Sequence, residues 1–183
     1  MDNWGKPIMA SLDKRDEVYL DVAENVSRLS TCQFTNVGCV ITTEKGQPVS
    51  WGTNGTAPGR PHCDDIEMGR DEHAGFANDY EIHAEMNAIL QSHGHDLRGC
   101  IAYTTITPCS NCLKHLAAVG ITRVVSKEAY WRDVAAGVDF SERASKYGIE
   151  LVIKSDYLTE APTVDIRASR VSSTDEGNAY ATL

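Results

Sequence analysis

Residues 100–126, CIAYTTITPCSNCLKHLAAVGITRVVS, decide the fold. The apolar runs at the two ends of this stretch, 100–106 and 121–126, are typical of buried strands. The segment between them, 109–120, predicts a helix, because a proline stands just before it and a glycine ends it. A strand, a helix and a second strand in this order predict a sheet that is covered by helices.

Further predicted elements flank this unit on both sides. The sequence predicts helices over 16–30, 83–93 and 133–147, and strands over 37–43, 48–53 and 149–154. A turn at 45–47 joins the first two of these strands into a hairpin, so the sheet is expected to be mixed. In the first helix we expect one buried face, formed by the apolar side chains Val18, Leu20, Val22, Val26 and Leu29.

Two segments show no such pattern. Residues 54–80 have little periodicity and many turn formers, and a loop of this length inside a compact domain is usually functional or carries its own stabiliser. Residues 155–183 are polar and rich in Ser, Thr and Asp. We therefore expect one domain over 1–154, followed by a polar tail or an arm on a neighbouring subunit.

Composition and charge narrow the class of protein. The 17 Lys and Arg against 26 Asp and Glu give a net charge of -9, which argues against a nucleic-acid binder but leaves room for a single nucleotide. No apolar run approaches the roughly 18 residues of a membrane span, and no signal peptide is visible. We expect a cytoplasmic protein, so the six cysteines are expected to bind metal or to lie buried rather than to form disulfides.

Two short motifs carry the chemistry. His83-Ala84-Glu85 opens one predicted helix, and Pro108-Cys109-Ser110-Asn111-Cys112 opens another. Three ligands, His83, Cys109 and Cys112, would leave the fourth tetrahedral position of a zinc ion open for water. A carboxylate at Glu85 could then move protons between water and substrate, and this combination is typical of zinc-dependent deaminases.

Other interpretations of the motifs are weaker. A C-x-x-C pair also occurs in structural zinc sites and in redox proteins. A redox role leaves His83 and Glu85 unexplained, and a structural zinc would require a fourth ligand that is not evident nearby.

Over residues 14–154 the chain resembles the deoxycytidylate (dCMP) deaminases of the cytidine deaminase superfamily. The matching stretches are EIHAEMNAIL (81–90), YTTITPCSNC (103–112), LKHLAAVGITRVV (113–125) and the turn Gly52-Thr53-Asn54-Gly55. The resemblance implies an α/β fold of three layers, α/β/α, with a five-stranded mixed sheet. It also implies zinc-dependent hydrolysis of dCMP to dUMP and ammonia, which feeds thymidylate synthesis.

The resemblance further implies roles for individual residues. Asn54 would bond the deoxyribose 3′-hydroxyl, although an Asn-Gly pair is also a common turn, and the backbone N–H of Ala84 would bond the cytosine carbonyl. The residues expected near the 5′-phosphate are Thr35, Asn36, Tyr130 and Arg132.

Regulation and assembly are also implied by the resemblance. Family members bind dCTP as an activator and dTTP as an inhibitor, with Mg²⁺, near the turn that contains Gly52, Asn54 and Gly55, between subunits of a homo-hexamer. Many members have Tyr where this chain has Thr53, so this residue leaves the regulation open.

Some phage and bacterial members carry a second, structural zinc, and its ligands match Cys32, Cys63 and His73 of this chain. The candidates for the fourth ligand are His62, Asp71 and Glu72, and the sequence does not choose among them. Free thiols and an exposed histidine are the alternative.

Two other functions remain open from the sequence. The chain could be another deaminase of the superfamily, acting on cytidine, a riboflavin precursor or tRNA adenosine. It could also be a catalytically silent zinc protein, but such a protein would not need Glu85.

Overall fold

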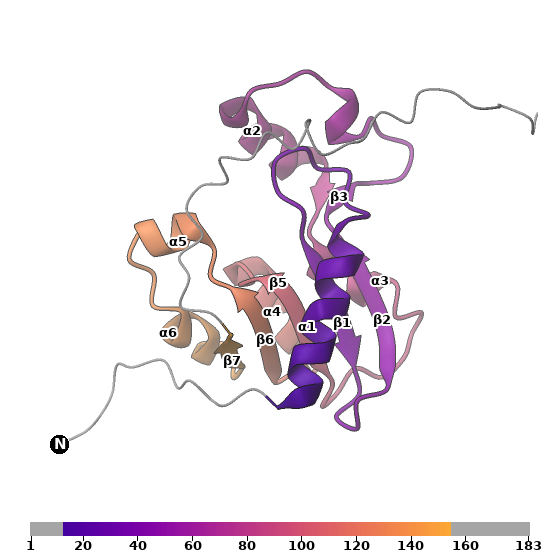
Figure 1. Ribbon diagram of the computed structural model, residues 1–183, viewed down its shortest axis with the longest axis vertical. Coiled ribbons are helices and arrows are strands. Elements are labelled where there is room, and N and C mark those ends of the chain that lie inside the picture. Colours follow the sequence, from indigo (N-terminus) through magenta and orange to yellow (C-terminus); the bar gives the residue numbers. More distant parts are fainter. Residues whose placement is uncertain (1–12, 155–183) are drawn as a thin grey trace, which may run out of the picture.

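The computed structural model describes residues 13–154, and its centre is a five-stranded mixed sheet (Figure 1). The strand order is β2 (Pro48–Thr53), β1 (Gly38–Thr42), β5 (Ile101–Ile106), β6 (Arg123–Glu128) and β7 (Glu150–Ile153). β1 runs antiparallel to both β2 and β5, whereas β5, β6 and β7 are parallel. The predicted mixed sheet is therefore confirmed. A second, two-stranded sheet pairs β3 (Gly55–Thr56) with β4 (Glu81–Ile82).

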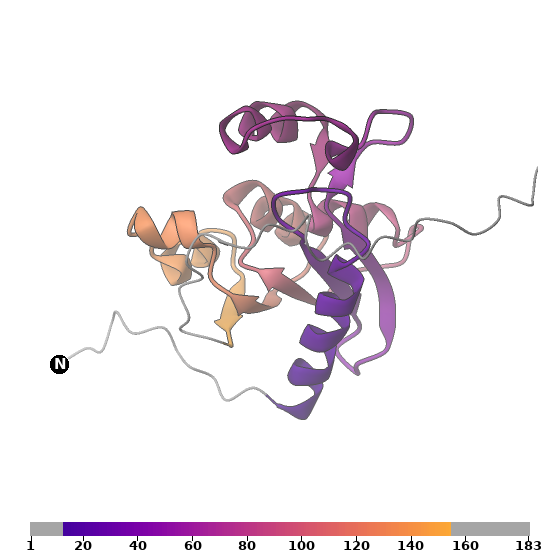
Figure 2. The ribbon, with the colours of Figure 1, turned by 45° about the horizontal axis from the view of Figure 1, so that its top comes forward.

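Helices cover both faces of the large sheet and make three layers (Figures 1 and 2). One face packs on α1 (Lys14–Ser27), and the other packs on α3 (Ala84–Leu90), α4 (Ser110–Ala118) and α6 (Phe140–Ser145). The strands serve both layers because their side chains alternate. Val40 of β1 packs on the α1 side, while its neighbours Cys39 and Ile41 pack on the other side.

The predicted buried face of the first helix is right for Leu20, which is buried, and for Val26, which packs against the core, but wrong for Val18, Val22 and Leu29. In α1 the buried residues are Asp16, Leu20, Ala23 and Ser27, whereas Val18, Val22 and Leu29 are 50%, 38% and 62% exposed. The helix lies very close to β1, because a Cβ at Gly38 would stand 2.0 Å from the Ala23 carbonyl oxygen. Small side chains permit this approach, so the helix buries Asp16, Ala23 and Ser27 beside Leu20 and leaves Val18 and Val22 exposed.

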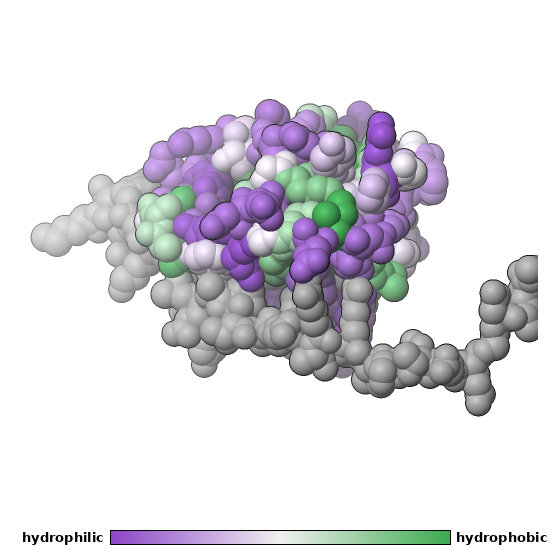
Figure 3. Space-filling model, turned by 90° about the horizontal axis from the view of Figure 1, so that it is seen from above, coloured by the Kyte–Doolittle hydropathy of each residue, from purple (hydrophilic) through white to green (hydrophobic). Residues whose placement is uncertain are grey.

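The segment 54–80 contains a helix that the sequence pattern did not reveal. A 3-10 turn, η1 (Cys63–Asp65), leads to α2 (Arg70–Tyr80). No residue of α2 is buried, so its sequence has no apolar periodicity to detect. Seen from the α2 end of the molecule, hydrophilic side chains surround a small apolar patch (Figure 3).

The predicted helix over 133–147 is instead two short helices, α5 (Trp131–Ala135) and α6. Gly137 separates them with a φ of 68°, a conformation that favours glycine and ends a helix. The predicted tail lies outside the described residues. Among residues 13–154, no helix is long and apolar enough to cross a membrane.

Candidate active site and metal centres

The structure brings His83, Cys109 and Cys112 together, as the sequence predicted. His83 is the N-cap of α3 and Cys109 is the N-cap of α4. The His83 Nδ1 atom lies 3.3 Å from Cys112 Sγ and 3.7 Å from Cys109 Sγ. Nitrogen and sulfur ligands of a tetrahedral zinc lie roughly 3.3–3.8 Å from one another, so these three atoms fit a zinc ion.

His83, Cys109 and Cys112 share protons through hydrogen bonds, and a metal ion bound to the three residues would displace these protons. A hydrogen bond with Cys112 is the main reason that the pKa of Cys109 falls to about 3, and the pKa of Cys112 is raised by the same bond and by burial. The hydrogen bond to Cys109 raises the pKa of His83 to about 9. Because zinc binds thiolates and neutral imidazole, its binding at this group releases protons.

Glu85 lies in the first turn of α3, and only 4% of its surface is exposed. Burial raises the pKa of its carboxyl group. The residue lines the same cavity as His83 and Cys109. A buried carboxyl group whose pKa is shifted towards neutrality is suited to accept and return a proton.

A second group of donor atoms lies at the base of α2. The Nε2 atom of His73 is 3.2 Å from Cys32 Sγ and 3.4 Å from the Oε1 atom of Glu81. Cys63 completes the group and accepts a hydrogen bond from the backbone N–H of Gln33. The Glu81 side chain is only 5% exposed. Two thiols, an imidazole and a buried carboxylate are a donor set that suits a closed zinc site.

The fourth member of this group is Glu81, not His62, Asp71 or Glu72. His62 Nδ1 lies 3.2 Å from the Thr31 hydroxyl, and Glu72 accepts a hydrogen bond from the Gly69 N–H. Glu81 belongs to β4, which pairs with β3 and returns the chain from α2 towards His83. Glu81 stands next to the His83 motif in the stretch EIHAEMNAIL, and no sequence spacing links it to Cys32 or Cys63.

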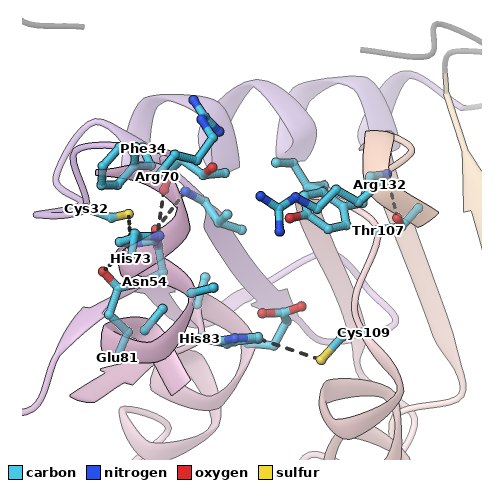
Figure 4. Close-up of a pocket in the computed structure, with 18 residues that line it drawn as sticks. Cys32, Phe34, Asn54, Arg70, His73, Glu81, His83, Thr107, Cys109 and Arg132 are labelled. Carbon is cyan, nitrogen blue, oxygen red and sulfur yellow. Dashed lines mark hydrogen bonds and ion pairs between the residues drawn. The ribbon is translucent and has the colours of Figure 1, made fainter. Parts of the chain in front are cut away.

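Members of both groups line one cavity of about 280 Å³ (Figure 4). Its lining includes His83, Cys109 and Glu85 as well as Cys32, His73 and Glu81. Of the residues predicted to touch substrate, those in the lining are Thr35, Asn54, Ala84, Tyr130 and Arg132. Asn36 is not among them, and its buried Oδ1 atom has no hydrogen-bond partner within the described residues.

Asn54 is held firmly at the cavity. Its Oδ1 atom accepts hydrogen bonds from the Val37 N–H at 2.8 Å and from the Ser30 hydroxyl at 2.7 Å. Its Nδ2 atom donates to the Thr35 carbonyl at 2.9 Å. An amide nitrogen has two N–H donors, so one is left for a ligand. These bonds fix both Asn54 and the segment that contains Thr35.

Gly52 and Gly55, predicted as part of an effector site, do not line the cavity. At Gly52 a Cβ would stand 2.3 Å from the Ala88 nitrogen and 2.4 Å from the Ala84 carbonyl oxygen. The absence of a side chain at Gly52 therefore allows β2 to pack against α3, which carries Glu85.

Comparison with known proteins agrees with this geometry. The family described as the cytidine and deoxycytidylate deaminase zinc-binding region matches residues 13–128. The deoxycytidylate deaminase of Enterobacteria phage T4 is 30% identical over 165 residues, covering 66% of this chain and 85% of that protein. The mouse deoxycytidylate deaminase is 28% identical over 174 residues, covering 84% and 96%.

A solved structure shares the fold. The dCMP deaminase of cyanophage S-TIM5, in complex with dCMP and dUMP, aligns with a TM-score of 0.61 and 23% identity, covering 78% of this chain and 98% of that one. The chain belongs to the cytidine and deoxycytidylate deaminase family of zinc-binding enzymes.

Proposed function

We propose that this chain catalyses the hydrolytic deamination of dCMP to dUMP and ammonia. The observation that carries this proposal is the shared cavity: His83 and Cys109 of the three-donor group and the buried Glu85 line the same space as Asn54 and Arg132. A nucleotide requires donors for its base, sugar and phosphate in one pocket. The T4 and mouse relatives, both deoxycytidylate deaminases, support the same substrate.

Each residue of the site has a separate role in the proposed reaction. Zinc bound at His83, Cys109 and Cys112 would supply a Lewis acid that lowers the pKa of a water molecule. Glu85 would take one proton from the attacking water and pass it to N3 of cytosine as the water oxygen bonds to C4. Glu85 would then carry the remaining proton of that oxygen to the amino group, so that the C4–N bond breaks, a C4 carbonyl forms and ammonia leaves. The N–H of Ala84 belongs to the first turn of α3 and has no helical acceptor, so it is available for the cytosine carbonyl.

We also propose that the Cys32, Cys63, His73 and Glu81 group binds a structural zinc. Burial raises the pKa of Cys32 to about 12 and raises that of Cys63, so a metal is needed to hold both as thiolates. α2 contains no buried residue, so no apolar face anchors this helix to the domain. A metal bound to His73 would anchor it instead. All six cysteines are free thiols, which suits a reducing compartment such as the cytoplasm.

Regulation by dCTP and dTTP with Mg²⁺, and assembly as a hexamer, remain predictions from the resemblance. The described residues supply a physical role for Gly52 in packing but no contact to an effector.

The substrate is tested by incubating the purified chain separately with dCMP, CMP, deoxycytidine and dCTP, with and without dCTP or dTTP as effectors, and measuring ammonia. We expect release from dCMP above all the others. Activity on deoxycytidine without activity on dCMP would overturn the proposed substrate. Deamination of none of the four would refute the function itself.

A further inference from the structure

Arg70 is a cation in the cavity wall, and no sequence motif marks it. It is the first residue of α2 and is half-buried. Its guanidinium carbon lies 5.4 Å from the centre of the Phe34 ring. No carboxylate among residues 13–154 forms an ion pair with it, although the chain has far more acidic than basic residues.

Arg132 lies across the cavity from Arg70, and both arginines are displaced to the same side of His83 and Cys109 (Figure 4). Its guanidinium carbon stands 5.1 Å from the centre of the Trp131 ring, and it too lacks an acidic partner within the described residues. Each arginine is therefore stacked on an aromatic ring while its N–H groups remain available.

Other arginines of the protein are used differently. Arg98, Arg123 and Arg143 each form an ion pair with an aspartate. Two arginines without such partners in one cavity, in a chain of net charge -9, make a local site for an anion. Guanidinium groups suit phosphate because several N–H donors lie in one plane.

The placement of Arg70 depends on the second donor group. Arg70 and His73 are three residues apart on α2, which places them on neighbouring turns of one face. Phe34 contacts both, with its ring centre 4.5 Å from that of His73. A metal held by His73 would therefore fix the position of Arg70 over the cavity.

We propose that Arg70 binds the 5′-phosphate of the substrate together with Arg132, and that His73 and Phe34 position Arg70 for this contact. The inference rests on the proposed nucleotide deaminase function. It makes Arg70 a residue that distinguishes a nucleotide from a nucleoside, and it connects the proposed structural metal to substrate selection.

Kinetics on matched substrates test the proposal. We expect Arg70→Gln to lower kcat/KM for dCMP by about 10- to 100-fold, mainly through KM, as for the loss of charge-assisted hydrogen bonds. Any activity on deoxycytidine should stay within about twofold of wild type, because that substrate has no phosphate. Arg70→Lys should lose less than Arg70→Gln, since it keeps the charge but not the planar fork. Arg60→Gln, an exposed arginine of the same connection that does not line the cavity, is the control and should resemble wild type.

A binding measurement separates this role from a structural one. Calorimetry with dUMP and deoxyuridine should show weaker dUMP binding in Arg70→Gln and in Phe34→Leu, with no change for deoxyuridine. Equal losses for dUMP and deoxyuridine would mean that Arg70 only supports the fold, and unchanged dCMP kinetics in Arg70→Gln would refute the phosphate contact. Absence of dCMP deamination in the wild-type chain would instead refute the proposed function, so the two failures are distinct.

Discussion

The carboxylate of Asp16 accepts two hydrogen bonds from the guanidinium of Arg123, each 2.9 Å long, across 107 positions of sequence. The pair joins the first turn of α1 to the start of β6, and the Asp16 side chain is 2% exposed. Burial raises the pKa of Asp16, but the hydrogen bonds and positive charge of Arg123 outweigh burial, so the pKa is lowered overall. Asp16 is thus ionised and paired at neutral pH.

This pair predicts a pH-dependent stability. Because the folded pKa lies below the ordinary value of 3.8, the stabilisation is complete above that value and is lost as the pH falls through the folded pKa. Asp16→Asn should lose about 2–4 kcal/mol of unfolding free energy at pH 7, because it removes the buried charged partner of Arg123 and leaves only the exposed Glu150, 3.4 Å from Arg123 Nε. Denaturant unfolding at pH 7 and pH 3 measures the difference between variant and wild type, which should shrink at pH 3. The same substitution at the exposed Asp96, which pairs with Arg98, is the control, and a pH-independent difference at Asp16 would contradict the prediction.

Glu85→Gln should retain the metal and lose the reaction. The amide is nearly isosteric with the carboxyl group but cannot carry a proton between water and substrate, so we expect a loss of about 10²- to 10⁴-fold in kcat. Zinc content by mass spectrometry and ammonia release from dCMP are measured on the same sample. Wild-type turnover in this variant would show that another group moves the protons.

The proposed structural zinc site predicts two zinc ions per chain. Cys63→Ala should remove one of them and lower the Tm, while the zinc at His83 remains. Cys39→Ala is the matched control, because both cysteines are fully buried but Cys39 belongs to neither donor group. It should lose packing stability and no metal. One zinc per chain in fully active wild-type protein would rule out the second site.

Gly52→Ala should destabilise the protein and reduce activity together. The added Cβ would meet backbone atoms of α3 at 2.3 and 2.4 Å, so β2 or the start of α3 must shift, at a cost of about 1–3 kcal/mol. Gly75→Ala tests the opposite case, since nothing lies within 4 Å of a Cβ there and Gly75 is inside α2. It should be neutral or stabilising by up to about 1 kcal/mol. Thermal unfolding of both variants gives the comparison, and equal Tm values would show that the Gly52 contact can relax.

The sequence by itself determined the parallel unit around Pro108 and the three donors His83, Cys109 and Cys112. These features are local: apolar runs give the strands, and the proline and glycine at its ends give the helix. Cys109 and Cys112 are three residues apart at the start of one helix, so they lie close together. His83 begins a second helix that packs in the same layer.

Only the tertiary structure decided which face of α1 is buried and what surrounds α2, because burial depends on what an element packs against. α1 buries Asp16 and Ala23 and leaves Val18 and Val22 exposed, since Arg123 and Gly38 lie opposite Asp16 and Ala23. α2 carries no apolar stripe, so only its position next to Cys32 and Glu81 shows that His73 belongs to a donor group and that Arg70 reaches the cavity. Contacts between residues far apart in the chain produce no periodic pattern in the sequence. Such contacts bring together the donor group of Cys32, Cys63, His73 and Glu81.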